Sequence, residues 1–158
     1  MSKHPRAVMG DSKFRFDSLA DMFGFQLRRV SACLKSALEA EFEPLGLRTS
    51  EATLLLAVGE SPGRTQADFG RDLRIKPANM VPLVARLAAA GYVERIPGER
   101  RAIVLKLTEA GVRQLEAVRQ ALQRHEDRIT QSLSAEDKAL ITMALKTIAD
   151  EECRLGHS

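Results

Sequence analysis

The stretch TQADFGRDLRIKPANMVPLVARLAAAGYVERIPGERRAIVLKL, residues 65–107, decides the fold, because it holds two short helical patterns and then changes period. Thr65 followed by Asp68 is a variant of the capping box and predicts the start of a first short helix. Over residues 76–90 the apolar residues fall at helical spacing again, and Gly91 supplies a stop. The expected buried face of this second helix is Met80, Val81, Val84, Leu87 and Ala88.

After Gly91 the apolar residues follow the shorter period that is typical of strands. Residues 92–96 and 102–107 form two predicted strands, and PGERR, residues 97–101, is the predicted turn between them. Two short helices followed by a basic hairpin make a winged helix-turn-helix, whose second short helix enters the DNA major groove. That groove is about 12 Å wide and admits one helix with its side chains.

Two prolines shape the second short helix. Pro77 suits its first position, where the missing N–H would have no helical partner. Pro82 removes an interior hydrogen bond, at a cost of about 3 kcal/mol. We therefore expect the first turn to be wound separately and slightly bent, so that its polar side chains face DNA. The alternative is an irregular turn over residues 76–81, with the regular helix beginning at Pro82.

Long amphipathic helices flank this segment. Apolar residues at steps of three and four predict a helix from a cap at Asp17 or Ser18 to Phe42, ended by EPLGL, residues 43–47. Further helices are predicted to begin near Thr49 or Ser50, after the cap Thr108, and after the cap Ser134 with Asp137. The predicted fold class is mainly α with a small β-hairpin.

The long helices carry more apolar surface than a three-helix centre could cover, so a second copy of the chain is expected to bury it. The winged helix-turn-helix would then be embedded in an all-helical dimerisation scaffold. The expected division is a flexible N-terminal tail, 1–16, a helical dimerisation region, 17–46 and 109–155, and a DNA-binding winged helix-turn-helix, 47–108.

Positive charge is concentrated in the middle of the chain. Residues 64–106 hold nine basic and four acidic side chains, a net charge of +5, whereas the whole chain carries +3. This asymmetry indicates a polyanionic partner, for which the hypothesis is double-stranded DNA. The expected DNA contacts come from the two short helices and the hairpin: Thr65, Gln66, Lys76, Ala78, Asn79, Arg86, Arg95, Arg100 and Arg101.

Individual roles follow from side-chain chemistry. The amide of Asn79 can hydrogen-bond adenine N6 and N7, and Lys76 can donate to guanine or to phosphate. Arg100 at the hairpin tip can enter a narrow minor groove. Thr65 and Gln66, at the start of the first short helix, are placed to contact the DNA backbone.

Other classes of protein find little support in the sequence. There is no apolar run of membrane-spanning length and no secretory leader over residues 1–16, so we expect a cytoplasmic protein. Cys33 and Cys153 are too few for a disulfide framework or a zinc site, and no cofactor or metal is expected. The chain lacks a Gly-rich phosphate loop and a nucleophile beside a base, so no enzyme is expected. Two alternatives remain, namely a redox-responsive regulator acting through Cys33 and a helical adaptor that binds an acidic partner.

Three segments together resemble the MarR family of bacterial transcriptional regulators. They are LRTSEATLLLAV at residues 47–58, the opening stretch extended through TEAG to residue 111, and LSAEDKALI at residues 133–141. The resemblance covers about residues 17–150. It implies a homodimer with interleaved first and last helices, which represses genes by covering a pseudo-palindromic operator. It also implies release of that operator by a small anionic aromatic or phenolic compound.

The resemblance places the effector near the first helix, between the dimerisation helices and the winged helix. The candidate ligand contacts there are Arg15, Phe16, Phe25, Arg28 and Arg29, with Phe14 as a further possible wall. A guanidinium can clamp a carboxylate with two parallel hydrogen bonds, and aromatic rings can pack against a phenyl group.

Overall fold

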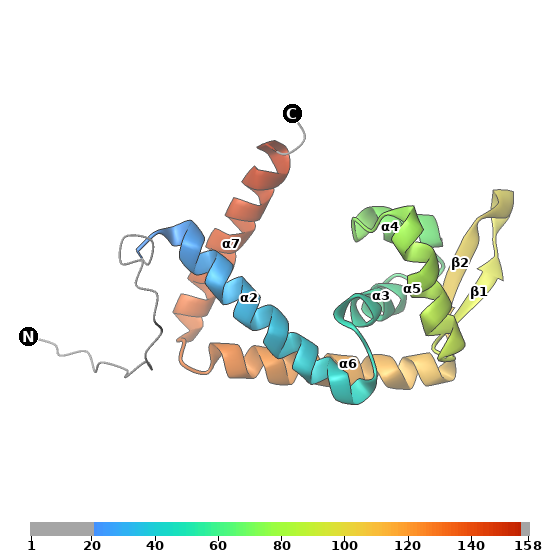
Figure 1. Cartoon of the computed structure of the whole chain (residues 1–158), viewed down its shortest axis with the longest axis horizontal. Helices are drawn as coiled ribbons and strands as arrows, with labels where there is room; N and C mark the ends of the chain where they lie inside the picture. Colours follow the sequence, from blue (N-terminus) through green and yellow to red (C-terminus); the bar gives the residue numbers. More distant parts are fainter. Residues whose placement is uncertain (1–20, 156–158) are drawn as a thin grey trace, which may run out of the picture. The chain divides into compact units, whose positions relative to one another are not determined.

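The structure, a computed structural model, describes residues 21–155 and consists of helices and one hairpin (Figure 1). In chain order its elements are α2 (Phe23–Phe42), the 3-10 turn η1 (Glu43–Leu45), α3 (Thr49–Glu60), α4 (Gln66–Asp72), α5 (Pro77–Ala89), β1 (Val93–Pro97), the 3-10 turn η2 (Glu99–Arg101), β2 (Ile103–Leu107), α6 (Glu109–Thr130) and α7 (Ala135–Leu155). They belong to two compact units, one ending at Lys35 and one beginning at Ser36. The predicted fold class, mainly α with a winged helix-turn-helix, is confirmed.

The first described helix begins later than the sequence predicted. Asp21 and Met22 precede α2, and the Met22 carbonyl accepts a hydrogen bond from the Phe25 N–H at 3.1 Å. The prediction of an unbroken helix from Asp17 or Ser18 is therefore wrong, although both proposed caps lie outside the described residues. An apolar stripe gives the face of a helix, but the residue at which the hydrogen bonds start depends on local backbone geometry.

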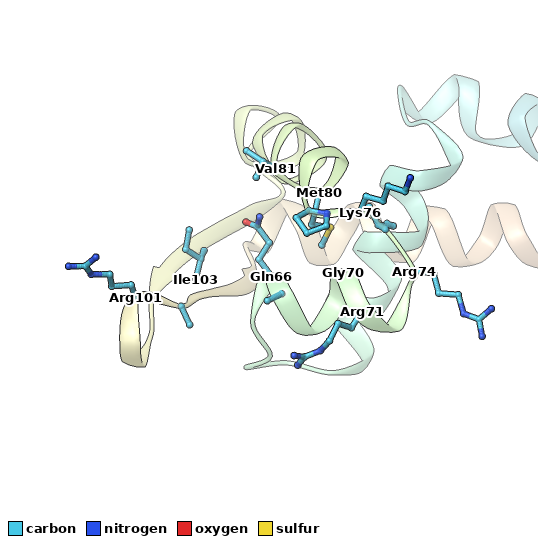
Figure 2. A pocket seen from close by; sticks show the side chains of 13 residues that line it. Gln66, Gly70, Arg71, Arg74, Lys76, Met80, Val81, Arg101 and Ile103 are labelled. Atoms are coloured by element: carbon cyan, nitrogen blue, oxygen red, sulfur yellow. The ribbon is translucent and has the colours of Figure 1, made fainter. Parts of the chain in front are cut away.

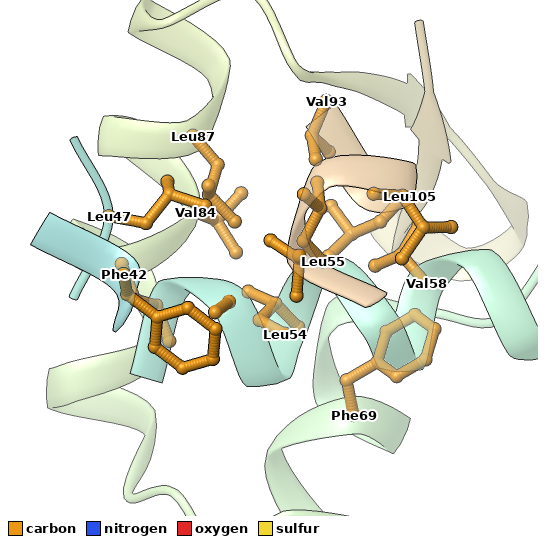
Figure 3. Packing of buried hydrophobic residues seen from close by; sticks show 14 of the residues in the cluster. Phe42, Leu47, Leu54, Leu55, Val58, Phe69, Val84, Leu87, Val93 and Leu105 are labelled. Carbon is orange, nitrogen blue, oxygen red and sulfur yellow. The ribbon is translucent and has the colours of Figure 1, made fainter. Parts of the chain in front are cut away.

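The core of the second unit forms where α3, α4, α5, α6 and β2 meet (Figure 3). Its most deeply buried large side chains come from all of these elements and from the end of α2: Phe42, Leu54, Leu55, Val58, Phe69, Met80, Val84, Leu87, Leu105 and Val118. Full burial of each such side chain contributes about 1.5 to 3 kcal/mol. The short helices are therefore held by a shared core rather than by their own length.

The buried face of α5 differs from the predicted one. Met80, Val84 and Leu87 are buried as predicted, but Val81 is 55% exposed and Leu83 is buried instead. The assignment of Val81 was wrong because one residue turns a helix by about 100°, which carries the position after Met80 away from the core. The contacts of α5 with α3, α4 and β1 fix its rotation, which apolar content alone leaves open.

The hairpin pairs β1 with β2 in antiparallel register, with Val93 opposite Leu107. Each strand begins one residue after the predicted start. Tyr92 lies outside β1 because its N–H donates to a carbonyl of the preceding helix, and the Ala102 carbonyl accepts from the Gly98 N–H to close the turn. Tyr92 and Ala102 are thus excluded from the strands by backbone hydrogen bonds, which residue type alone does not predict.

The hairpin is also attached to the segment before α4. The Leu105 N–H donates to the Arg64 carbonyl at 3.2 Å, and Thr65 forms an isolated bridge with Val104. The backbone itself therefore holds the hairpin against the first short helix.

The predicted caps of the last two helices are confirmed. Thr108 Oγ1 accepts from the Gly111 N–H at 2.9 Å, and Ser134 Oγ accepts from the Asp137 N–H at 3.0 Å. Helix α7 keeps four large apolar side chains at the surface: Leu140, Ile141, Met143 and Leu145. Such a surface is typical of a protein contact.

Candidate nucleic-acid interface

Helix α4 begins with the predicted capping box. Thr65 Oγ1 accepts from the Asp68 N–H at 3.2 Å, and Asp68 Oδ2 accepts from the Thr65 N–H at 3.0 Å. Hydrogen bonds from the Thr65 hydroxyl and N–H lower the pKa of Asp68. Gln66 is half-buried, and its Oε1 has no hydrogen-bond partner within residues 21–155. The contacts of Thr65 and Gln66 with the DNA backbone stay predictions.

A left-handed residue sets the turn between α4 and α5. Arg74 has φ 53°, and the next N–H, that of Ile75, donates to the Gly70 carbonyl at 2.8 Å. This conformation costs about 1 to 2 kcal/mol for a residue with a side chain. Helix α5 starts directly afterwards, where the Lys76 carbonyl accepts from the Asn79 N–H at 2.9 Å. The turn therefore fixes the direction in which α5 leaves α4.

Helix α5 is continuous through Pro82. The alternative of an irregular turn over residues 76–81 is therefore wrong. Pro77 takes the first helical position, as predicted, and the turn exposes Lys76 and Asn79 to solvent. A bend at the internal proline stays a prediction.

A groove of about 570 Å³ runs along one side of α5. Its lining comes from α3, the turn before α5 and α5 itself: Ser50, Arg74, Ile75, Lys76, Asn79, Pro82, Leu83 and Arg86. Three predicted DNA contacts, Lys76, Asn79 and Arg86, therefore lie along one groove, and Ala78 is exposed near its start.

A second hollow, also of about 570 Å³, lies between α4, α5 and β2 (Figure 2). Gln66 and Met80 line it, and Figure 2 shows Arg101 extending outward from the hairpin. Arg74 and Lys76 line this hollow as well as the groove. The start of α5 therefore lies between two depressions, and two cationic side chains border both of them.

The hairpin tip presents two arginines from a left-handed backbone. Arg100 has φ 50° and Arg101 has φ 63°, and both side chains are exposed, as is that of Arg95 on β1. Each left-handed residue costs about 1 to 2 kcal/mol, and such conformations often occur at functional sites. The three arginines predicted to bind DNA from the hairpin are thus accessible to a polyanion.

Two other basic residues of this segment are already paired with carboxylates. Arg64 forms a salt bridge with Asp72, and its guanidinium lies 5.7 Å from the centre of the Phe69 ring. Arg71 forms a salt bridge with Asp68. The formal charge of the segment therefore overstates what it offers to a partner.

Arg86 is held by a buried carboxylate on α3. Glu51 is only 6% exposed, and its Oε1 accepts from Arg86 Nε at 2.5 Å while its Oε2 accepts from the Arg48 N–H at 2.8 Å. Burial alone would raise the pKa of Glu51, but these hydrogen bonds and the nearby positive charges outweigh it and lower the pKa. Sequence reasoning missed Glu51, because a partner 35 residues away leaves no local pattern.

This pairing predicts a pH-dependent stability. The folded-state pKa of Glu51 lies below the ordinary 4.5, so its contribution is fully present above that value and is lost as the pH falls through the folded-state pKa. Glu51→Gln is expected to lower the free energy of unfolding by about 1 kcal/mol at pH 7, and its difference from wild type is expected to shrink as the pH falls through the folded-state pKa of Glu51. Urea unfolding at a series of pH values measures the difference; a constant difference over the range would contradict the assignment.

The predicted effector contacts are described only in part. Arg15, Phe16 and Phe14 lie outside the described residues. On α2, Phe25 is half-buried and Arg28 and Arg29 are exposed, with Arg29 Nη1 donating to Gln26 Oε1 at 3.4 Å. A ligand site formed by these residues stays a prediction.

The structure also gives the positions of a cysteine and a histidine that the proposed DNA contacts do not include. Cys33 is exposed on α2, and His125 is buried on α6 with its Nδ1 3.2 Å from Arg128 Nη2. Residues 21–155 contain no cluster of three or more metal-ligating side chains. Within the same range, no helix combines the length and apolar character that crossing a membrane requires.

Residues 45–102 match the family model described as MarR family. An HTH-type transcriptional repressor of Mycobacterium tuberculosis is 35% identical over 72 residues, which cover 46% of this chain. A repressor of Mycobacterium bovis matches equally well. The matched region spans about half the length of these relatives, 52%.

Solved structures resemble the chain over a longer range. The transcriptional repressor CouR bound to a 23-mer DNA duplex has a TM-score of 0.80 at 27% identity, covering 87% of this chain and 99% of that one. CouR bound to p-coumaroyl-CoA has a TM-score of 0.76 at 25% identity, covering 87% and 98%. The reduced form of MarR from E. coli, at 22% identity, has a TM-score of 0.70 and covers 80% and 96%, which shows a shared fold.

Proposed function

We propose that the chain is a MarR-family regulator, namely a dimeric, sequence-specific DNA-binding repressor, because residues 45–102 match the model of that family. The observation that carries the proposal is the groove along α5, where Lys76, Asn79 and Arg86 lie together. Exposed Arg95, Arg100 and Arg101 stand on the adjoining hairpin. A helix that reads base edges beside a basic hairpin that binds phosphate is the recognition mode of winged helices.

A homodimer is supported by the apolar surface of the long helices. On α7, Leu140 and Met143 are both 61% exposed, which is costly for a helix that stays alone in water. A two-fold dimer presents two copies of α5 to half-sites about 34 to 36 Å apart, or to a multiple of that spacing. The proposed operator is therefore pseudo-palindromic. A regulator acts where its DNA is, so the proposed location is the cytoplasm.

The proposed effector is a small aromatic or phenolic acid. The similar protein CouR has been solved with p-coumaroyl-CoA, an aromatic anion. In this chain Arg28, Arg29 and Phe25 on α2 offer the matching cation and aromatic groups, together with the predicted contacts Arg15 and Phe16. Cys33 is exposed on the same helix, so oxidation is the second candidate signal.

The test of DNA reading uses two single substitutions. Arg100→Ala is expected to weaken binding to every duplex and to reduce the slope of log K against log salt by about 1, because Arg100 meets phosphate or a minor groove. Asn79→Ala is expected to lose about 1 to 3 kcal/mol of discrimination at particular base pairs, because its amide meets base edges. Fluorescence anisotropy on the DNA upstream of the protein's own gene and on a scrambled duplex measures both.

Arg119→Ala serves as the control, because Arg119 is an exposed arginine on α6, outside the interface. It should leave affinity and salt slope close to wild type. An Asn79 variant that keeps the full preference of the wild type would exclude the assigned base contact. Salt-insensitive binding by the wild type would favour the adaptor hypothesis.

A further inference from the structure

We propose that Glu51 is a positioning residue for operator recognition, which holds Arg86 so that its outer guanidinium edge reads a guanine in the major groove. The inference rests on the proposed function, since it assigns a task within the same interface. Glu51 itself does not touch DNA. It acts through Arg86.

The carboxylate of Glu51 is fixed from two directions. It is buried at the start of α3, the helix that also carries the core residues Leu54 and Leu55. One oxygen accepts from the Arg48 N–H at 2.8 Å and the other from Arg86 Nε at 2.5 Å. With both oxygens engaged and little room to move, the carboxylate is a rigid anchor. A buried carboxylate is tolerated only when it is paired in this way.

One part of the Arg86 side chain contacts the Glu51 carboxylate, and the other part is exposed to solvent. Its side chain is 44% exposed although Nε is bound to Glu51. A guanidinium has five N–H donors in a flat fork, of which Nε carries one and the two terminal nitrogens carry four. Pairing at Nε therefore leaves four donors on the terminal nitrogens. One N–H of each terminal nitrogen points outward, and these two parallel donors match guanine O6 and N7. The exposed half of the side chain retains the chemistry of base recognition.

The position of Arg86 on α5 suits this role. Asn79, Pro82 and Arg86 follow one another at steps of three and four, so they lie on one face of the helix, and all three line the same groove. Seven residues rise about 10 Å along a helix, which is about three base steps. Asn79 and Arg86 are therefore spaced to read separate base pairs of one half-site.

Anchoring favours specificity over general affinity. A free arginine samples many rotamers and binds phosphate or base alike, whereas an arginine fixed by a carboxylate is limited to one direction. The negative charge of Glu51 also opposes non-specific attraction to phosphate. Loss of Glu51 should therefore reduce the preference for the operator while leaving binding to arbitrary DNA unchanged or stronger. A pair that served stability alone would change both affinities together.

The experiment begins with wild-type protein and a random-sequence duplex library, from which the bound DNA is selected and sequenced. Affinity is then measured on the enriched motif and on a scrambled duplex for Glu51→Gln, Arg86→Lys and the double variant. Glu51→Gln is expected to lower the preference for the motif roughly tenfold, chiefly at a G·C pair. Arg86→Lys is expected to do the same, because lysine keeps the charge but lacks the fork. The double variant should lose no more than Arg86→Lys alone.

Two further variants keep the result interpretable. Glu94→Gln removes one negative charge from exposed β1, opposite Lys106, and should leave the preference unchanged. Glu51→Asp keeps the charge but shortens the reach to Arg86, so it should lose preference even if Glu51→Gln fails to fold. Thermal unfolding of every variant identifies those that are folded at the assay temperature.

The outcomes separate the two proposals. If wild type enriches no motif, the proposed function fails and this inference fails with it. If wild type enriches a motif but folded Glu51 variants keep the full preference, or if the losses of Glu51→Gln and Arg86→Lys add in the double variant, this inference alone is overturned.

Discussion

Substituting glutamate for both Leu140 and Ile141 is expected to convert the protein from a dimer to a monomer and to lower operator affinity at least a hundredfold. Both side chains are exposed on α7, at 61% and 44%. In the proposed dimer they are buried against the second copy, where two unpaired carboxylates would cost several kcal/mol. A monomer engages one half-site only and loses the gain from two linked reading helices. Sedimentation velocity and anisotropy on a two-half-site duplex measure the two effects.

The matched control places two glutamates on the other side of the same helix, at Ala139 and Thr142. Both positions are exposed, and at about 100° per residue they point away from the apolar stripe that contains Leu140 and Ile141. This variant gains the same charge and should stay dimeric. A dimer that survives the substitutions at Leu140 and Ile141 would place the contact surface elsewhere.

Gly111→Ala is expected to destabilise the protein by about 3 kcal/mol or more, which corresponds to a fall of roughly 10 °C in Tm. A Cβ at this position would lie 1.9 Å from the Tyr92 carbonyl oxygen and 2.9 Å from its carbon. The obstacle is backbone, and the same carbonyl accepts from the Thr108 N–H at 3.1 Å. The start of α6 would have to move away from the base of the hairpin. Differential scanning calorimetry measures the loss.

Two other helical glycines calibrate this prediction. Gly24→Ala places its Cβ in open space, so the variant should be unchanged or slightly more stable. Gly59→Ala meets the end of the Leu115 side chain at 2.3 Å, which can rotate, so an intermediate loss is expected. Equal stability of all three variants would show that the close approach of Gly111 to Tyr92 can relax.

The sequence predicted the local features of the fold well. The capping box at Thr65, the caps at Thr108 and Ser134 and the first position of Pro77 are all present in the structure. Each of these signals depends on residues within about one helical turn of one another. It can therefore be recognised in the sequence without knowledge of the tertiary contacts. The period change after Gly91 likewise predicted the hairpin to within one residue of each strand's start.

The errors have a common cause. The sequence predicts that Val81 lies in the core and that one unbroken helix extends to Phe42 from a cap at Asp17 or Ser18. In the structure Val81 is exposed, and Asp21 and Met22 precede the helix that ends at Phe42. In both cases the apolar spacing identified the element as a helix, but it did not identify which face is buried or at which residue the helix begins. Those depend on which neighbouring element the helix packs against, which is a property of the fold.

The features of the interface likewise fall into those that the sequence predicts and those that only the tertiary structure decides. The chain's own order of residues determined that a basic segment, 64–106, would form two short helices and a hairpin, because caps, prolines, glycines and periodicity act over a few residues. Tertiary structure alone decided that Arg86 is anchored by Glu51 while Lys76 and Asn79 share its groove. Contacts between side chains far apart in sequence exist only once the core of α3 and α5 has brought them together.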